Sequence, residues 1–495
     1  MKVLLIYPEF PDTFWSFKHA LPFQGKRSAY PPLGLLTVAA MLPTSWEKQA
    51  VDLNVRPVKD SELAWADVVF LSGMMVQGPS MKKVIDRARE RGLRTVVGGP
   101  IASTKDPNIV DADHIVEGEA EELVSILAKD LEAGSARAHY KAPVLPDLTQ
   151  VPAPELRLLN LRKYSAMAVQ YSRGCPFTCE FCDIIEIYGR KPRTKAPEQV
   201  LAELDQIYNM GWRGRVFLVD DNFIGNKKNV KKLLPELVRW NRDHAFPFSF
   251  LTEASLNLAE DKELLGYMRD AHFNGVFMGI ETPVPESLKE TTKFQNLRKD
   301  LLESVKLVQS YGMEVMAGFI VGFDNDPPDV FERQIQFIRE AAIPISMVGL
   351  LSALPNTQLW RRLKGEGRLL RESLGSNTLL DMNFIPRMDT QELLDGYRRI
   401  LETIYYPREY FNRVQAFLSQ LGTPTRTPVV FSDFLAVARS LWKQGLRSDY
   451  RREYWRFLAQ TVRQHRQHMD KALTLAIMGH HFFELTGSVL SENQV

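Results

Sequence analysis

The stretch that decides the fold is Arg173-Gly174-Cys175-Pro176-Phe177-Thr178-Cys179-Glu180-Phe181-Cys182-Asp183, which contains every cysteine of the 495-residue chain. The cysteines follow the spacing CxxxCxxC, directly after a predicted strand at 166–171. Three thiolates on one short loop favour a soft metal. They are one ligand short of a four-cysteine zinc site, whereas three cysteines on an iron–sulfur cube leave one iron open. A zinc site completed by a distant histidine and a chance cluster are the alternatives.

From this loop onward, strand, loop and helix alternate through residues 165–350. Six parallel β/α units predict a barrel or partial barrel, with the chemistry at the C-terminal ends of its strands. The predicted strands are 166–171, 215–220, 247–252, 275–279, 314–321 and 345–350. The predicted helices between them include 197–210, 229–244, 261–271, 297–311 and 329–342.

Before the loop, residues 1–145 alternate short apolar runs with helical patterns. Five buried strands at 3–7, 51–55, 68–72, 95–97 and 115–116, separated by helices, predict a Rossmann-like, doubly wound α/β domain. Ligands of such sheets bind beyond the carboxyl ends of the strands, where Gly73, Gly98, Gly99 and Gly118 suit close approach of a large ligand. No GxGxxG follows the first strand, so a dinucleotide is not expected; a domain without a ligand is the alternative.

The rest of the chain completes the predicted organisation. We expect domains at 1–145 and 165–365, a linker at 146–164 with several prolines nearby, and a helical domain at 366–495. The chain is 45% hydrophobic and 25% charged with a net charge of +2, which is typical of a globular protein and gives no reason to expect nucleic acid. Three cysteines cannot build a disulfide framework, and no window of 18 uninterrupted apolar residues occurs, so we expect a soluble cytoplasmic protein.

The cysteine loop after the first strand of a six-unit barrel resembles the radical SAM superfamily. The resemblance implies that Cys175, Cys179 and Cys182 hold a [4Fe–4S] cluster whose fourth iron binds S-adenosylmethionine (SAM). An electron from an external donor of the flavodoxin or ferredoxin type would then cleave SAM to a 5′-deoxyadenosyl radical. Phe181 matches the family's aromatic position beside the adenine.

The N-terminal domain resembles the cobalamin-binding domain of the B12-dependent subgroup, which implies cobalamin as a further cofactor and Glu119, with the four glycines named above, among the residues that bind cofactor. The usual DxHxxG signature is absent from the loop 8–23, which contains His19, and recurs only at 270–275 inside the barrel, where we interpret His272 as structural. The C-terminal part resembles the helical extension of hopanoid C2-methylase and tetraether-lipid radical enzymes. The matching stretches are Pro31-Pro32-Leu33-Gly34-Leu35, Val97-Gly98-Gly99-Pro100, Glu117-Gly118-Glu119-Ala120-Glu121, Asn356-Thr357-Gln358-Leu359 and Asn383-Phe384-Ile385-Pro386.

Polar groups at the other strand ends match family positions that contact SAM. Asp220 and Asp221 either receive the SAM ammonium group or cap the next helix, and Asp221 matches the family motif. Glu253 points toward SAM or belongs to a helix-cap network. Glu281 ends a Gly-x-Glu strand and would face the ribose or the methionine moiety, while Gly318 lies on a strand that would line the adenine or is simply buried.

These resemblances imply an enzyme that C-methylates an unactivated carbon of a small-molecule or lipid substrate, with cobalamin as methyl carrier. The lack of a fourth cysteine excludes auxiliary clusters and a cysteine methyl carrier, so the radical would act on the substrate directly. Radical cyclisation, rearrangement or carbon–carbon coupling without methyl transfer is the alternative. No catalytic side chain is assigned.

The C-terminal region contains a basic repeat. Arg439, Lys443, Arg447 and Arg451 recur every four residues and would form one stripe on a helix. Aromatic residues lie among them, so the stripe either contacts an anionic membrane surface or is a solvated face whose aromatics pack on the barrel. His465 and His468, and the adjacent His480 and His481, are given no role.

Overall fold

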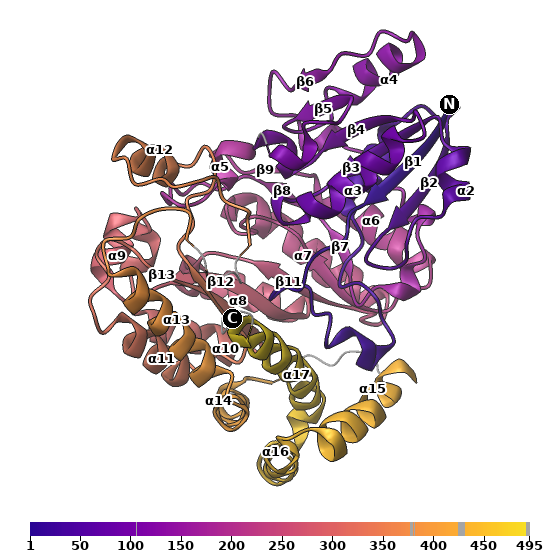
Figure 1. The fold of residues 1–495 in the computed structure, drawn as a ribbon. Coiled ribbons are helices and arrows are strands. Elements are labelled where there is room, and N and C mark those ends of the chain that lie inside the picture. The colour runs from indigo at the N-terminus through magenta and orange to yellow at the C-terminus, as the bar shows by residue number, and fades with distance from the viewer. Residues whose placement is uncertain (105, 377–379, 381, 424–430, 492–495) are drawn as a thin grey trace.

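The computed structural model describes residues 1–104, 106–376, 380, 382–423 and 431–491. Within these residues the chain forms two six-stranded parallel sheets with flanking helices and a group of C-terminal helices (Figure 1). The α/β prediction is therefore confirmed, including the Rossmann-like first sheet, the partial barrel and the helical C-terminal region.

The first sheet has the strand order β2-β1-β3-β4-β5-β6 and is parallel throughout. Its central strands are apolar runs because helices cover both faces. The edge strand β2 begins earlier than predicted, since its first residues alternate between exposed and half-buried and give no apolar run. The three-residue strand β6 was not predicted. The strands are β1 (Lys2–Tyr7), β2 (Glu47–Asp52), β3 (Val68–Ser72), β4 (Arg94–Gly98), β5 (His114–Glu117) and β6 (His139–Lys141), and the helices are α1 (Leu33–Met41), α2 (Asp60–Trp65), α3 (Gly78–Arg89) and α4 (Val124–Glu132).

The second sheet has the order β14-β13-β12-β11-β10-β7, so β7 and β14 are its open edges, as in a partial barrel. All of its predicted strands are present. A short antiparallel pair, β8 (Ser172–Arg173) with β9 (Arg193–Thr194), flanks the cysteine loop and was not predicted. The other strands are β7 (Met167–Val169), β10 (Gly214–Leu218), β11 (Phe248–Glu253), β12 (Phe273–Glu281), β13 (Glu314–Val321) and β14 (Ser346–Leu350), and the helices are α5 (Ile184–Ile187), α6 (Pro197–Asn209), α7 (Lys227–Asp243), α8 (Lys262–Asp270), α9 (Pro285–Glu290), α10 (Leu301–Ser310) and α11 (Val330–Glu340).

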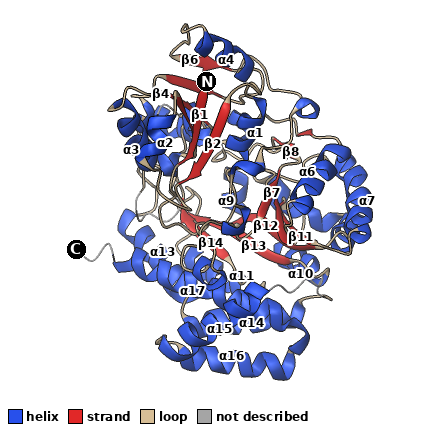
Figure 2. Cartoon of the chain, turned by 90° about the vertical axis from the view of Figure 1, so that its right-hand side faces the viewer, coloured by secondary structure: helices blue, strands red, loops and turns tan. Residues whose placement is uncertain are grey.

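The helices α13–α17 gather on one side of the barrel, while α12 lies apart from them near α5 (Figures 1 and 2). The prediction that the basic repeat lies on a single helix is wrong. Helix α15 passes into a π-helical turn at Lys443–Arg447, and the helix ends there before α16 begins. No helix of the described residues has the length and hydropathy needed to span a membrane. The helices are α12 (Gln358–Gly365), α13 (Thr390–Ile404), α14 (Pro407–Gln420), α15 (Phe431–Trp442), α16 (Arg451–Gln464) and α17 (Met469–Ser491).

The loop that follows β1 packs into the apolar core that the barrel shares with the C-terminal helices, whereas the two faces of the first sheet have apolar cores of their own. Phe14 stacks on Phe482 of α17 with ring centroids 4.5 Å apart, and its carbonyl lies 3.2 Å from Nε2 of His481. Trp15 packs edge-on against Phe277 of β12 at 5.1 Å. The core that contains this loop continues through the barrel and into α13–α17, so the N-terminal loop is held by both other parts.

Candidate active site at the facing strand ends

The carboxyl ends of the two sheets face each other, and three contacts join them. After β5, Glu119 pairs with Arg173 of β8 at 2.6 Å. After β4, the carbonyl of Ser103 accepts a hydrogen bond from Asn356 Nδ2, which follows β14, at 3.3 Å. After β3, the side chain of Met75 lies against Gly375. The predicted glycine-rich ends and the cysteine loop are thereby brought to one interface, which is where parallel sheets bind ligands.

The cysteine loop is held in place by its neighbours. Gly174 has φ +93°, and a Cβ there would lie 2.8 Å from the carbonyl oxygen of Gly189, so only glycine fits. Its amide donates to Oδ2 of Asp221 at 2.8 Å, and the amide of Cys175 donates to the Gly189 carbonyl at 3.3 Å. The loop conformation is thus fixed by groups from β10 and α5.

Two of the three sulfur atoms have a side-chain amide donor beside them. Asn222 Nδ2 lies 3.7 Å from Sγ of Cys175, and Gln295 Nε2 lies 3.6 Å from Sγ of Cys179. Burial raises the pKa of the Cys175 and Cys182 thiols, while Lys293 lies close enough to lower that of Cys175. Amide donors and a nearby cation favour sulfur that carries negative charge, and hydrogen bonds to sulfur tune iron–sulfur clusters. The donor set therefore fits such a cluster.

No three His, Cys, Asp or Glu side chains within the described ranges are arranged around a point that would take a single metal ion. The cysteine spacing assigns no role to Lys293, Asn222 or Gln295, because these residues are distant from the cysteines along the chain.

Two adjacent carboxylates at the end of β10 fix the backbone before the cysteines. Both oxygens of Asp220 are used, one by the Tyr171 amide at 2.8 Å and one by the Ser172 hydroxyl at 2.7 Å. Burial raises the pKa of Asp220 to about 7 and that of Asp221 to about 6. The interpretation that they cap the next helix is wrong, because Asn226 is the N-cap of α7.

Glu253 and Glu281 lie at the ends of neighbouring strands. Burial, together with the charges of Asp221 and Asp220, raises the pKa of Glu253 to about 8. Glu281 has φ +66° at a bulge of β12, and its carboxylate pairs with Lys293 at 2.6 Å. Strained backbone at non-glycine residues clusters at functional sites. Lys293 also lies 5.9 Å from the ring centroid of Phe181.

The glycines are explained in part by packing within the protein. Gly99 has φ +84°, and a Cβ would lie 2.6 Å from Oγ of Ser72. A Cβ on Gly73 would meet Gln77 and Met81 at 3.0 Å, and one on Gly318 would meet the Phe277 ring at 3.0 Å. Gly98 and Gly118 have more room, with nearest atoms at 3.8 Å and 3.5 Å. Glu119 is bound by Arg173 and also by Arg193 at 2.5 Å.

The histidines lie away from this interface or serve packing. His272 is at the amino end of β12, opposite the cysteine loop, and stacks on Phe246 at 4.2 Å. His19 stacks on His481 at 5.5 Å in the core between the first loop and α17. Burial lowers the pKa of His481 to about 4 and that of His480 to about 3.

The inner face of the second sheet, opposite its helices, is mostly apolar. Its central side chains are only partly buried, although they lie in the middle of a sheet. Trp15 donates its indole N–H to Sδ of Met347 at 3.1 Å, and Tyr30 packs on Phe217 at 5.1 Å, so the N-terminal part contributes to this face. The apolar side chains of the inner face are Phe217, Leu251, Phe277, Met316, Ile320 and Met347.

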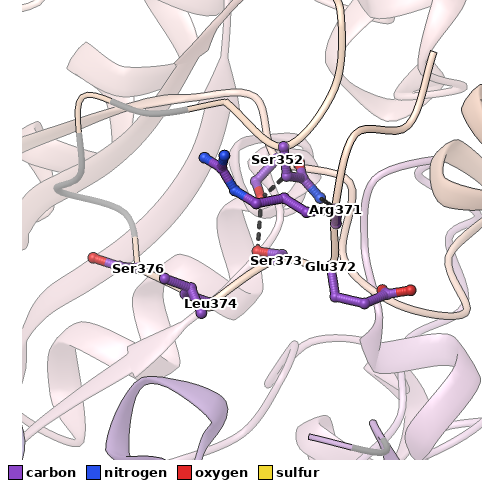
Figure 3. Close-up of a pocket in the computed structure, with 7 residues that line it drawn as sticks. Ser352, Arg371, Glu372, Ser373, Leu374 and Ser376 are labelled. Atoms are coloured by element: carbon purple, nitrogen blue, oxygen red, sulfur yellow. Dashed lines mark hydrogen bonds between the residues drawn. The ribbon is translucent and has the colours of Figure 1, made fainter. Parts of the chain in front are cut away.

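Two cavities lie outside this face. A cavity of about 20 Å³ beside the end of β14 is lined in part by Ser352 and Ser373, whose hydroxyl groups share a hydrogen bond of 2.8 Å (Figure 3). That volume suits a water molecule rather than a substrate. A larger cavity of about 300 Å³ lies at the edge strand β2, beside Asp52 and Tyr164.

Comparison with known families agrees with this arrangement. Family models match residues 27–128 as a B12 binding domain, residues 169–338 as the radical SAM superfamily and residues 357–494 as a domain of unknown function. The chain is 44% identical to an uncharacterized methyltransferase of Synechocystis sp., over 99% of this chain and 93% of that protein. It is 35% identical to hopanoid C-2 methylase of Rhodopseudomonas palustris, over 97% and 92%.

Two solved structures share the fold at low sequence identity. The radical SAM methyltransferase TsrM of Kitasatospora setae, with cobalamin and a [4Fe-4S] cluster bound, has a TM-score of 0.60 at 16% identity and covers 93% of this chain and 99% of its own. The cobalamin-dependent radical enzyme OxsB has a TM-score of 0.62 at 15% identity, over 99% and 80%.

Proposed function

This chain belongs to the cobalamin-dependent radical SAM methyltransferase family that includes hopanoid C-2 methylase, and from that premise we propose that it methylates an unactivated carbon of a largely apolar, lipid-like substrate. The family makes it an enzyme with a [4Fe–4S] cluster, SAM and cobalamin as cofactors. The substrate class and the residue roles below are the proposal.

Cys175, Cys179 and Cys182 are proposed to hold the cluster. When bound, the cluster, SAM and cobalamin together would supply a 5′-deoxyadenosyl radical and a transferable methyl group, given electrons from an external flavodoxin- or ferredoxin-type donor. Asn222 and Gln295 donate to two of the sulfur atoms, which stabilises negative charge on them.

The remaining residues are proposed to position the ligands. Asp220 and Asp221 fix the backbone on the amino side of the cysteines, and Glu119 ties that segment to the first sheet through Arg173. SAM contacts are proposed for Phe181, Asp221, Glu253, Glu281 and Gly318, and cobalamin contacts for Gly73, Gly98, Gly99 and Gly118.

The substrate class depends on a single observation, the apolar inner face of the second sheet. Apart from Arg215 of β10 and from Glu253 and Glu281 at the strand ends, its partly buried side chains are aromatic, methionine or aliphatic. Such a face binds hydrocarbon by the hydrophobic effect and offers few partners to a polar substrate. Burial raises the pKa of Glu253 to about 8, which favours the uncharged form of this carboxyl group at neutral pH. Hopanoid C-2 methylase, by its name, acts on a lipid of this kind.

The test is an anaerobic assay of the reconstituted enzyme. With a strong reductant and SAM carrying a labelled methyl group, we expect 5′-deoxyadenosine and label in a neutral lipid fraction. Each of Cys175→Ser, Cys179→Ser and Cys182→Ser should abolish both, and Phe277→Glu should abolish lipid labelling while 5′-deoxyadenosine still forms. The conservative Phe277→Leu is the control. Label that enters only water-soluble acceptors would refute the substrate class, and 5′-deoxyadenosine from a cysteine variant would refute the cluster assignment.

A further inference from the structure

The outer surface of the C-terminal helices combines exposed aromatic side chains with exposed arginines that have no acidic partner among the described residues. Both views place α16 at the end of the molecule farthest from α4 and β6 (Figures 1 and 2). On α16 the inward positions Tyr454, Phe457, Leu458 and Thr461 are buried against its neighbours. The positions between them point outward. We propose that the surface formed by α15, the π-helical turn and α16 docks onto an anionic lipid bilayer; we call it the basic aromatic face.

The apolar part of the basic aromatic face is larger than scattered surface residues would give. Trp442 is 54% exposed, Leu446 58% and Trp455 46%. They lie together, because the Trp455 indole N–H donates to the carbonyl of Gly445 at 2.8 Å, next to Leu446. Phe434, Leu435 and Val462 on the same two helices are also exposed, at 66%, 40% and 53%. Tryptophan and leucine in such a cluster are typical of segments that enter the interfacial layer of a membrane.

The charge of this segment is complementary to an anionic surface. Residues 433–466 contain eight Lys or Arg and three Asp or Glu, whereas the whole chain has a net charge of only +2. The positive charge is therefore local. Arg451, Arg452 and Arg456 are exposed and form no ion pair with any acidic side chain in the part of the chain that the structure describes. The guanidinium group of Arg447 lies 4.9 Å from the Trp442 ring centroid, so cation and aromatic share one surface.

Two of the predicted stripe residues have another task. Arg439 donates to the carbonyl oxygen of Phe23 at 2.8 Å, and the ammonium group of Lys443 lies 5.5 Å from the Phe23 ring centroid. They attach α15 to the N-terminal segment at Leu21–Gln24. The alternative that the whole stripe is a solvated face therefore does not hold for Arg439 and Lys443, because these two cations contact Phe23 within the protein. The other cations of the stripe face outward. The docked cations hold the outer ones in a fixed orientation relative to the rest of the chain.

A lipid bilayer is favoured over an acidic protein because exposed apolar and aromatic side chains share this face with the cations. Its tryptophans are flanked by long arginine side chains that can reach headgroups while their methylenes stay in the apolar layer. The docking does not depend on the methyl-transfer proposal, because it needs no cofactor.

The test is co-sedimentation of the full-length, anaerobically purified protein with vesicles of phosphatidylcholine plus phosphatidylserine, and of phosphatidylcholine alone. We expect binding only to the anionic vesicles, and weaker binding as salt is raised. Each basic side chain near such a surface contributes about fivefold to affinity. Arg451→Glu with Arg452→Glu should therefore weaken binding more than tenfold. Ile126→Ala with Lys129→Glu, exposed on α4 at the opposite end, is the matched control and should bind as wild type.

A second readout locates the contact. Brominated lipid in the anionic vesicles should quench tryptophan fluorescence, and Trp442→Phe should remove a large part of that quenching while retaining the fold. Equal binding to phosphatidylcholine alone, an equal loss in the control variant, or undiminished quenching in Trp442→Phe would each overturn the proposal. Sedimentation without vesicles that the charge-reversal variant removes would show instead that this face joins two copies of the chain. The assay contains neither SAM nor substrate, so its failure leaves the methylase proposal intact.

Discussion

The ion pairs of Glu119 are expected to hold the cysteine segment to the first sheet, and Glu119→Gln tests this. The Glu119 side chain is 2% exposed and is shared by Arg173 and Arg193, which are 12% and 15% exposed. The amide of glutamine keeps the shape but removes the charge. Arg173 retains Glu121 at 2.6 Å, whereas Arg193 retains only the carbonyl groups of Pro146 and Tyr188 among its described partners.

The magnitude follows from these remaining contacts. Removing one partner of a buried ion pair costs about 3–5 kcal/mol. Since one arginine keeps a carboxylate, we expect the lower end, about 3 kcal/mol. In a domain of this size about 1 kcal/mol lowers the melting temperature by about 2–4 °C, so the expected loss is about 6–12 °C.

The assay is thermal melting followed by circular dichroism, with iron content after reconstitution as a second measurement. Glu117→Gln is the control two residues away, since the partners of Glu117 among the described residues are His139 and Lys141, which are 51% and 68% exposed. Exposed pairs contribute about 0–1 kcal/mol, so its melting temperature should fall by only a few degrees. Equal shifts in the two variants, or a double variant Glu119→Gln/Arg193→Met whose loss is the sum of the single losses, would refute the reasoning.

Three further outcomes are expected in melting experiments. The pKa of Glu253 is raised above its ordinary value of 4.5 to about 8, so between these two pH values the native state keeps a proton that the unfolded state has released, and stability falls as the pH rises. We therefore expect Glu253→Gln to melt at a higher temperature than wild type at pH 8 and at the same temperature at pH 5. A difference in melting temperature that does not change with pH would contradict this. Gly99→Ala should cost about 1–3 kcal/mol, because its Cβ would clash with Ser72, whereas Gly92→Ala, with φ +65° but nothing within 4 Å, should cost about 1 kcal/mol; similar losses would exclude the clash. The pKa of His481 is lowered by burial from 6.5 to about 4, so the unfolded state gains a proton first and stability falls as the pH drops below about 6.5. The melting temperature of His481→Gln should therefore decline less steeply than that of wild type between pH 7 and 5. The same decline in both proteins would exclude this histidine as its source.

The fold class was readable because each central strand is a buried run that differs from the helices beside it. Strand β13 lies at the predicted residues 314–321, and the other barrel strands begin and end within a few residues of prediction. Elements with little local signal were missed. β8 and β9 have two residues each, and β6 has three, so none shows a period. The π-helical turn at Lys443–Arg447, which contains Gly445, was also not predicted.

In the candidate site, too, residues with a local sequence signal were predicted and residues without one were not. The cysteine spacing located the loop, since the three cysteines are neighbours in the chain. Lys293, Gln295 and Asn222 were not identified, because they lie between 40 and 120 residues away along the chain and approach the sulfurs only through the packing of the loops after β10 and β12. Asp220 and Asp221 were singled out as a pair, but the interpretation that they cap the next helix is wrong, because Asn226 is the N-cap of α7.

The sequence by itself determined the local chemistry of this protein: three thiols on one loop, two series of alternating strands and helices, and a basic, aromatic C-terminal segment. These are set by spacing along the chain. Only the tertiary structure decided which surfaces meet: the carboxyl ends of the two sheets across Glu119 and Arg173, the first loop against α17, and which arginines face solvent. The physical reason is that such contacts depend on burial and charge between segments that are tens to hundreds of residues apart, and periodicity within a short window contains no information about them.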